Sequence, residues 1–497
     1  MSLMGLDIGT TGCKCSLFTE DGVLIAASYR EYSLVLPKPG YFEFDPHLLW
    51  KSVQEVIEET ASQSGGDLIK AISVSSFGET AIPIAQDGSV LGNGLLYTDI
   101  RGFDEALLLE QSLGKTKVMA LAGVPLHPMF TVAKMMWMKR HEPQWFRRVW
   151  KFLLIGDYIV FRLTGMTAID YTLASRTMAF NITTKKWETE ILRAAELDQS
   201  LLSEPVASGE AIGRVTPQCC ERLGLKGRPM VVAGGHDQAC AALGAGILRE
   251  GQAIDGIGTV ECIAPTYSRP VVNETMLRLQ YNCAPHVLDG HYLTYAFNFT
   301  GGSLLKWFRN EFGYKAESEA HLRGMDVYNY LNLTAPIEPT DLVIIPHFAG
   351  SGTPHMKPEA KGLIYGLTFQ TTAADVYRAC MEGVTYEMRY NLECLKEAGI
   401  AVDSLRAVGG GAKSDLWLQL KADIMNRTIE RLNISEAGTI GTVILAGRAV
   451  GAFATFEEAA QILVKPLKSF YPHVERRDQY EERYEKFKRL SNLLSDW

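Results

Sequence analysis

One segment near the middle of the chain limits what this sequence can fold into. It runs from residue 231 to residue 246 and reads VVAGGHDQACAALGAG. Its first residues are typical of the end of a buried strand, Gly234 and Gly235 predict a tight turn, and the small residues that follow suit a closely packed helix. Asp237 then stands where strand gives way to helix, which is where open α/β folds bind ligands. Asp is also a favoured helix N-cap, so capping alone explains Asp237 equally well.

Size and composition describe an ordinary globular protein of two or three domains. The 497 residues are 47% hydrophobic and 21% charged, and the formal net charge of −8 argues against a broad nucleic-acid surface. No apolar run approaches the length of a membrane span, and the N-terminus shows no secretory signal pattern. The nine cysteines lack metal-ligand spacing. We therefore expect reduced thiols and a cytoplasmic protein without nucleic-acid or membrane partners.

A glycine-rich loop lies inside a predicted β-meander over residues 4–33, which includes a hairpin turn at residues 20–22. Glycines let the backbone approach a ligand closely, and successive N–H groups can form an anion nest. A carboxylate before the loop suits Mg²⁺ bound through water. A glycine-rich hairpin without a ligand is the alternative. The candidate ligand-binding residues of this loop are Asp7, Gly9, Thr10, Thr11, Gly12 and Lys14.

Two polar clusters follow strands that we expect at residues 69–75 and 90–97, after a helix that Asp45 caps and Pro46 begins. Carboxylates in these clusters can bind hydroxyls through charge-assisted hydrogen bonds. Surface turns with an exposed Asp–Arg pair explain the same residues. We interpret residues 172–177, TLASRT, as a surface loop without chemistry of its own. The cluster residues are Gly78, Glu79, Asp99 and Arg101.

The second half of the chain begins near residues 244–254 and opens with a similar device, a strand, a Gly-Thr turn and a second strand. Gly258 and Thr259 form that turn, and a plain β-turn is the alternative. Gly302 precedes an apolar helix that it can cap or use to approach a ligand. Three consecutive glycines at residues 409–411 precede a helix that Ser414 caps, and they can let a flat nucleoside lie against the backbone. A simple glycine-rich turn explains them too.

These pieces together resemble the FGGY family of carbohydrate kinases, within the actin-like/Hsp70-like ATPase superfamily. The likeness runs from Gly5 to about Phe453, and the motifs fall in the family's order. They are GLDIGTTGCK, ETAIPIAQDGSVLGNGLLYTDIR, GDYIVFRLTG with TLASRT, AGGHDQ, GTVECI, GLTFQTTAADVYRACMEGVTYEMR and VGGGAKSDLW. The resemblance implies a two-lobed α/β fold, actin-like/Hsp70-like (ribonuclease H-like), with mixed sheets and helices on both faces. It implies lobes at residues 1–246, for the sugar and the first phosphate loop, and 247–497, for the nucleotide.

The resemblance also implies roles for individual residues in an ATP-dependent sugar kinase. Asp237 becomes the general base for a sugar hydroxyl, and Asp7 and Asp237 lie at the Mg²⁺. The residues implied to face the sugar or polyol are Gly78, Glu79, Asp99 and Gln238. Those implied to bind ATP are Gly9, Thr10, Thr11, Lys14, Gly258, Thr259, Gly302, Gly410, Gly411 and Ser414. Phosphoryl transfer fits this set, because it needs positioning and charge neutralisation more than covalent chemistry.

Departures from the family pattern bear on the substrate. Gly78 stands where an Arg usually precedes Glu79, Met129 replaces an expected Tyr, and the Met-His pair of xylulokinase-like members is absent. We expect an open-chain ketopentose such as xylulose, or a related sugar or polyol, with His236 a sugar contact or a turn residue. The alternative is an actin/Hsp70-like nucleotide switch, which needs no polyol cluster. Family resemblance also makes a homodimer an expectation.

Overall fold

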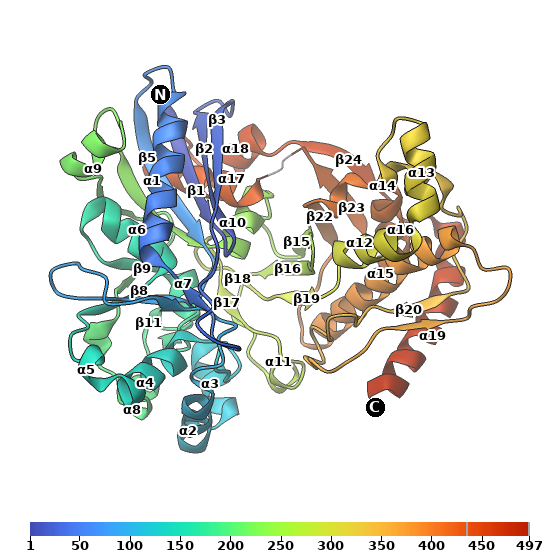
Figure 1. The fold of residues 1–497 in the computed structure, drawn as a ribbon, viewed down its shortest axis with the longest axis horizontal. Helices are drawn as coiled ribbons and strands as arrows, with labels where there is room; N and C mark the ends of the chain where they lie inside the picture. Colours follow the sequence, from blue (N-terminus) through green and yellow to red (C-terminus); the bar gives the residue numbers. More distant parts are fainter. Residues whose placement is uncertain (434–435, 496–497) are drawn as a thin grey trace.

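The computed structural model describes residues 1–433 and 436–495 and consists of two α/β lobes (Figure 1). The first lobe holds a six-stranded sheet in the order β13-β14-β5-β1-β2-β3. β1, β5 and β14 run parallel, while β2, β3 and β13 are antiparallel to their neighbours. Its strands are β1 (Ser2–Ile8), β2 (Gly12–Thr19), β3 (Leu24–Glu31), β5 (Ile69–Ser76), β13 (Ala211–Arg214) and β14 (Met230–His236).

The sequence of the central strands explains their place in the sheet. β1 and β5 are buried along almost their whole length, as expected for parallel strands covered on both faces. The predicted meander is confirmed: β1 pairs with β2 and β2 with β3, and Thr19 and Val23 close the turn between the latter two. The carboxyl ends of β1, β5 and β14 therefore meet at one edge of the sheet.

The second lobe holds an eight-stranded sheet in the order β17-β18-β16-β15-β22-β23-β24, with β19 paired to β16. β15, β22 and β23 run parallel, so their carboxyl ends also meet at one edge. The strands are β15 (Gln252–Ile257), β16 (Glu261–Tyr267), β17 (Ala284–Pro285), β18 (Tyr292–Leu293), β19 (Ala296–Asn298), β22 (Ser404–Val408), β23 (Thr428–Leu432) and β24 (Pro466–Phe470).

Short two-stranded pairs complete the β-structure. They join β4 (Glu43–Phe44) to β7 (Gly94–Leu95), β6 (Ala81–Ile84) to β8 (Lys151–Leu154), β9 (Ala168–Asp170) to β12 (Glu204–Val206), β10 (Phe180–Asn181) to β11 (Lys186–Trp187), and β20 (Val343–Ile345) to β21 (Leu363–Tyr365).

Helices of the first half begin with α1, which confirms the predicted cap: Asp45 accepts hydrogen bonds from the His47 and Leu48 N–H groups, and Pro46 starts the helix. The helices of this half are α1 (Pro46–Ser62), α2 (Phe103–Leu113), α3 (Lys115–Ala122), α4 (Thr131–His141), α5 (Pro143–Phe146), α6 (Ile155–Thr164), α7 (Tyr171–Ser175), α8 (Thr189–Ala194), η1 (Gln199–Leu201), α9 (Pro217–Arg222) and α10 (Asp237–Gly244).

Helices of the second half include α17, which packs across the sequence boundary against β1 and β5 of the first sheet and against α10 (Figure 1). The proposed division at residues 246 and 247 therefore assigns one covering helix of the first sheet to the second segment. The helices are α11 (Glu274–Arg278), α12 (Gly302–Phe312), α13 (Tyr314–Leu322), α14 (Val327–Thr334), α15 (Ala373–Glu397), η2 (Gly411–Lys413), α16 (Asp415–Met425), α17 (Ala437–Ala449), α18 (Phe456–Leu463), η3 (Val474–Arg476) and α19 (Arg477–Ser495).

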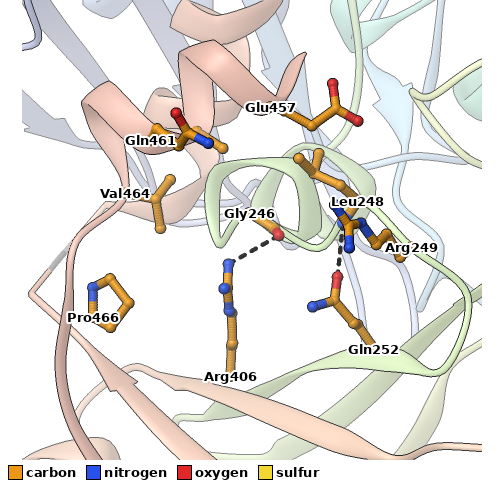
Figure 2. Close-up of a pocket in the computed structure, with 10 residues that line it drawn as sticks. Gly246, Leu248, Arg249, Gln252, Arg406, Glu457, Gln461, Val464 and Pro466 are labelled. Carbon is orange, nitrogen blue, oxygen red and sulfur yellow. Dashed lines mark hydrogen bonds between the residues drawn. The ribbon is translucent and has the colours of Figure 1, made fainter. Parts of the chain in front are cut away.

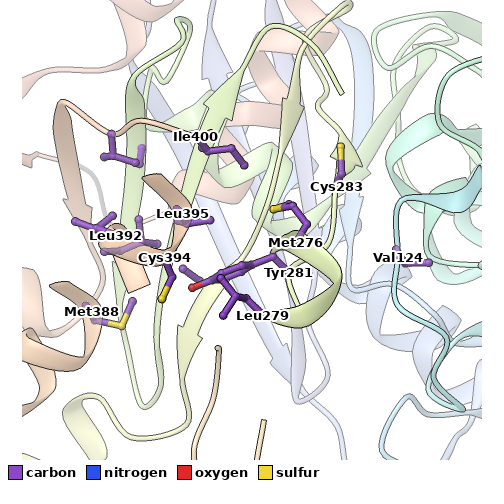
Figure 3. Packing of buried hydrophobic residues seen from close by; sticks show 14 of the residues in the cluster. Val124, Met276, Leu279, Tyr281, Cys283, Met388, Leu392, Cys394, Leu395 and Ile400 are labelled. Atoms are coloured by element: carbon purple, nitrogen blue, oxygen red, sulfur yellow. The ribbon is translucent and has the colours of Figure 1, made fainter. Parts of the chain in front are cut away.

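A buried apolar cluster continues from one lobe into the other. Figure 3 shows Tyr281 and Cys283 between Val124 of the first lobe and Leu395 of α15. The Cys283 N–H donates to the Gly123 carbonyl at 2.6 Å, and a Cβ on Gly123 would lie 2.1 Å from the Cys283 carbonyl oxygen. Close backbone packing thus joins the lobes at this side of the molecule.

Two further expectations can be compared with the structure. The strand expected at residues 90–97 is wrong: within it β7 covers only Gly94 and Leu95, because Gly92 packs under Trp145, where a Cβ would lie 1.9 Å from the ring. All nine cysteines are free, as expected. Among residues 1–433 and 436–495, no helix has both the length and the apolar character needed to cross a bilayer.

Candidate active site

Three acidic or hydroxyl side chains meet at the carboxyl edge of the first sheet. Asp7 in β1 lies opposite Ser75 in β5, and Ser75 lies opposite Gly235 in β14. The Ser75 hydroxyl donates to Asp7 Oδ1 at 2.7 Å. Burial, and secondarily the charge of Asp237, raise the pKa of Asp7 to about 6. Asp237 therefore lies close enough for its charge to disfavour the ionised form of Asp7.

Asp237 begins α10 but does not cap it, which corrects the N-cap interpretation. His236 occupies the cap position without a side-chain hydrogen bond, and Asp237 Oδ1 accepts from the Gln238 N–H at 2.6 Å. The expected turn at Gly234 and Gly235 is also wrong, because β14 continues to His236 through a register shift. A Cβ on Gly234 would lie 1.9 Å from the Val74 carbonyl oxygen, so the glycine serves close strand packing.

The charge state of Asp237 suits proton abstraction. Its side chain is 31% exposed. Burial raises its pKa to about 6, against the lowering effects of the Gln238 N–H and of Arg176. The carboxyl group is thus ionised at neutral pH and close to the working range of a general base. Burial and Arg176 lower the pKa of neighbouring His236 to about 3, so its imidazole is neutral.

A crossing of two helices at glycine residues fixes the position of α10. A Cβ on Gly244 of α10 would lie 1.8 Å from the Ala437 carbonyl oxygen, and one on Gly441 of α17 would lie 1.9 Å from the Cys240 carbonyl oxygen. Only glycine permits backbones to approach this closely. Gly438, one turn earlier in α17, faces the Asp7 carboxylate in the same way. The helix that carries Asp237 and the strand that carries Asp7 therefore pack on one partner helix.

Glu79, one of the predicted polyol residues, is joined by an arginine that the sequence analysis missed. Arg176 Nε donates to Glu79 Oε1 at 2.6 Å, and both side chains are buried. The interpretation of residues 172–177 as a surface loop is therefore wrong: Thr172 to Thr177 are buried, and Arg176, which caps the carboxyl end of α7, reaches into the site. No local pattern signals this, because the two residues lie 97 positions apart.

Asp99 forms the ion pair with Arg101 that was the alternative interpretation, but the pair is buried. Asp99 Oδ1 accepts from Arg101 Nε at 2.8 Å, and Oδ2 accepts from Arg101 Nη2 and from the Phe42 N–H. Both carboxylate oxygens are thus already engaged. Gly78 lies against Arg176 and His236, and Gln238 follows Asp237 in α10.

The first loop offers free hydrogen-bond donors. The Gly9 N–H is bonded to the Gly12 carbonyl, whereas the N–H groups and hydroxyls of Thr10 and Thr11 have no hydrogen-bond partner in residues 1–433 and 436–495. Lys14 pairs with Glu436, at the start of α17, at 2.6 Å. An anion bound here would therefore meet free N–H groups, while Lys14 would share its charge with Glu436.

The second Gly-Thr turn is tied to the start of α12. The N–H groups of Gly301 and Ser303 donate to the Thr259 carbonyl, and that of Gly302 donates to the Gly258 carbonyl. Gly302 is the first residue of α12. The turn after β15 and the N-terminus of a helix thus form one surface, and helix N-termini favour anions.

A cavity of about 750 Å³ lies beside this turn in the second lobe. A Cβ on Gly410 would meet nothing within 4 Å, whereas Gly411 packs on Ile257 and Trp417. Ser414 accepts from the Trp417 N–H and caps α16, as predicted. Gly258, Thr259, Gly302, Gly410, Gly411 and Ser414 all line the cavity, together with residues that the sequence analysis did not single out: Lys306, Asp326, Tyr328, Asn329, Asn332 and Tyr377.

The connection between the lobes is braced by Arg406. Figure 2 shows its guanidinium beside the end of α10 in a second cavity of about 470 Å³. Arg406 Nη1 donates to the carbonyls of Ala245 and Gly246 at 2.9 Å, and Nε pairs with Glu430. The helix that begins at Asp237 is thus held at its carboxyl end by β22 of the second-lobe sheet.

The chain matches two descriptions of one family. Residues 2–244 match "FGGY family of carbohydrate kinases, N-terminal domain", and residues 256–450 match the C-terminal domain of the same family. It is 30% identical over 501 residues to a xylulose kinase of Bacillus subtilis, covering 99% of this chain and 97% of that one. It is 30% identical to a glycerol kinase of Saccharolobus islandicus, covering 95% and 92%.

Solved structures show the same fold. A ligand-bound xylulose kinase from Lactobacillus acidophilus has a TM-score of 0.90 at 24% identity and covers 99% of this chain and 98% of that one. A xylulose kinase from Rhodospirillum rubrum has a TM-score of 0.90 at 24% identity and covers 99% of each chain. The fold is therefore the two-lobed actin-like/Hsp70-like α/β fold that the sequence predicts.

This agreement over nearly the full length decides between the two functions considered from sequence. It supports a phosphotransferase that uses ATP and an alcohol acceptor, and it excludes the nucleotide switch. The chain belongs to the FGGY family of carbohydrate kinases.

Proposed function

We propose that this kinase phosphorylates a hydroxyl of an open-chain ketopentose such as xylulose, with Asp237 as the general base. The observation that carries the proposal is the position of Asp237 at the carboxyl edge of the first sheet, ionised at neutral pH and beside the buried Glu79–Arg176 pair. Relatives named xylulose kinase at 30% identity support the substrate class.

In this proposal the chain's own residues bind and orient both substrates. Asp237 accepts the proton of the attacking hydroxyl, and the sugar lies against Gly78, Glu79 and Gln238. Asp99 has a structural role in this proposal and supports the sugar site through its ion pair with Arg101, because both of its carboxylate oxygens already accept hydrogen bonds. The two lobes close over the sugar and keep water from the reacting phosphate.

The second substrate, ATP, binds between the lobes. The adenosine end lies in the cavity beside Gly410, Gly411 and Ser414. The terminal phosphates lie between Thr10 and Thr11 on one side and the Gly258 turn on the other. Gly9 gives the first loop its close approach, and Lys14, Thr259 and Gly302 complete the phosphate contacts. Positioning of this kind is the main source of rate in phosphoryl transfer.

The carboxylates fit a magnesium ion. Burial raises the pKa of both Asp7 and Asp237, and the charge of Asp237 adds to the shift at Asp7, so a cation between the two carboxylates would favour their ionised forms. No group of three or more His, Cys, Asp or Glu residues that could hold a metal occurs in the described ranges. Mg²⁺ suits this, since it binds one or two carboxylates plus phosphates and water. Mg²⁺ would supply charge neutralisation to the transferring phosphate, with Asp7 and Asp237 holding it.

A coupled assay of ADP release across ketoses, aldoses and polyols tests the proposal. We expect the highest kcat/KM with D-xylulose over an ATP-only baseline. A higher kcat/KM with glycerol than with D-xylulose would refute the ketopentose and indicate glycerol as the substrate. An aldose as the best substrate would refute the proposal of an open-chain ketose. Size-exclusion chromatography of the same sample tests the proposed homodimer.

A further inference from the structure

A side chain at position 78 would clash with the Arg176 side chain. A Cβ on Gly78 would lie 2.7 Å from Arg176 Cγ, 3.0 Å from Arg176 Cβ and 3.1 Å from His236 Cδ2. Gly78 has no positive φ, so backbone conformation does not require glycine there. What requires it is the path of the Arg176 side chain, which crosses the glycine on its way to Glu79.

The backbone of Glu79 is held in an unfavourable conformation. Its φ of 63° lies in the left-handed region, which costs free energy for a residue with a side chain. The Thr131 hydroxyl donates to the Glu79 carbonyl at 2.6 Å and fixes this conformation. Strain that surrounding contacts maintain is characteristic of functional sites. Here it turns the Glu79 carboxylate toward Arg176.

Aromatic rings enclose the guanidinium. Its central carbon lies 5.1 Å from the ring centre of Phe130 and 5.8 Å from that of Tyr295. Tyr295, which lies between β18 and β19 of the second half, also contacts His236 Nδ1 through its hydroxyl at 3.2 Å. The pair is thus bounded by residues from both halves of the chain, next to Asp237.

The pair still has polar capacity to offer. Arg176 is 7% exposed and Glu79 is 4% exposed. Arg176 bonds Glu79 Oε1 through Nε and Nη2, whereas Arg176 Nη1 and Glu79 Oε2 have no hydrogen-bond partner in the described ranges. This donor and this acceptor are free to bind a ligand, and two adjacent hydroxyl groups would satisfy both.

We propose that Arg176 is a specificity-determining residue that binds, together with Glu79, two adjacent hydroxyls of a neutral polyol chain and rejects sugar acids. This rests on the proposed function, because it places the sugar beside Asp237. Arg176 donates to one hydroxyl and Glu79 accepts from the next. Since Glu79 neutralises Arg176 and Asp237 adds a negative charge, a substrate carboxylate gains no net attraction here.

Direct binding tests the pair without relying on turnover. Calorimetric titration of the wild type with xylitol and with D-xylonate, which differ only by a terminal carboxylate, gives the starting preference. We expect xylitol to bind at least about tenfold more tightly, and Arg176→Lys to weaken xylitol binding by roughly 10- to 100-fold, as loss of charge-assisted hydrogen bonds does. The isosteric Glu79→Gln should lower the ratio of xylitol affinity to D-xylonate affinity about tenfold, because it removes a negative charge beside the ligand. Unchanged xylitol affinity in Arg176→Lys would overturn the proposal.

A double-mutant cycle tests the steric relation. Gly78→Ala should displace Arg176 and raise the KM for D-xylulose as Arg176→Ala does, with the KM for ATP unchanged. The double variant should be no worse than either single variant, because both changes remove the same contact. Additive losses would contradict the shared contact. A wild type that binds xylitol but phosphorylates no sugar would refute the proposed function and leave the binding result for Arg176 standing.

Discussion

The crossing of α10 and α17 is the feature that we expect to set catalytic geometry, and Gly441→Ala tests it. The new Cβ would lie 1.9 Å from the Cys240 carbonyl oxygen. Backbone carbon–oxygen contacts of this kind need about 3.3 Å, so the helices must part by about 1.4 Å. The oxygen belongs to a helix backbone and cannot rotate away. Asp237, three residues before Cys240, must move with it.

A displacement of this size has two consequences. Overpacking costs about 1–3 kcal/mol of stability. Misplacement of a catalytic group by about 1 Å costs roughly 100-fold in rate. We therefore expect kcat for sugar-dependent ADP release to fall roughly 100-fold, while the KM for ATP stays within about twofold, because the cavity that we propose for adenosine is in the other lobe.

A matched variant separates stability from geometry. Gly383→Ala in α15 places a Cβ 2.4 Å from the Ile344 carbonyl oxygen, between a helix and β20 of the second lobe. We expect a similar loss of thermal stability with kcat retained. The two variants are compared at equal folded fraction. If the kcat of Gly441→Ala equals that of Gly383→Ala, the helix crossing does not set the position of Asp237 and the reasoning is refuted.

Two further predictions concern buried charge. Lys421 bridges Asp255 and Glu261, all three side chains are fully buried, and burial raises the pKa of Glu261. Lys421→Met leaves two buried carboxylates without their cation, so it should lower the free energy of unfolding, measured by urea titration, by about 3–5 kcal/mol. A loss below about 1 kcal/mol would contradict this prediction. Burial lowers the pKa of His286 from 6.5 to about 3. On acidification His286 therefore takes up a proton in the unfolded chain but stays neutral in the folded chain. From pH 7.5 to pH 5 the wild type should lose about 2 kcal/mol more stability than His286→Gln, and equal losses would disprove this.

Local signals predicted the elements that local chemistry determines. Asp45 with Pro46 and Ser414 mark helix starts, because caps satisfy N–H groups within a few residues. The meander of β1 to β3 follows from alternation and a turn sequence. The strand expected at residues 90–97 failed because neighbouring glycines pack against other elements, a tertiary effect that propensity does not contain.

The site could be predicted where a motif carries it and not where distant segments meet. Asp7, Asp237, Gly258 and Gly410 stand at or just after the carboxyl ends of β1, β14, β15 and β22, and the parallel strands of each sheet bring these ends to one edge. Arg176 lies 97 residues from Glu79 in a segment without any chemical pattern, so only the fold reveals the pair. The small residues of α17 indicate close helix packing, but their sequence does not identify Cys240 and Asp7 as the groups that Gly441 and Gly438 face.

The role of Asp237 is the central claim, and Asp237→Asn tests it most directly, because the amide keeps the shape of the carboxylate and removes its basicity. Sugar-dependent ADP release and ATP binding are measured on the same preparation. We expect kcat to fall by about 10²- to 10⁴-fold, as loss of a general base does, with ATP affinity unchanged. Wild-type turnover in this variant would contradict the account.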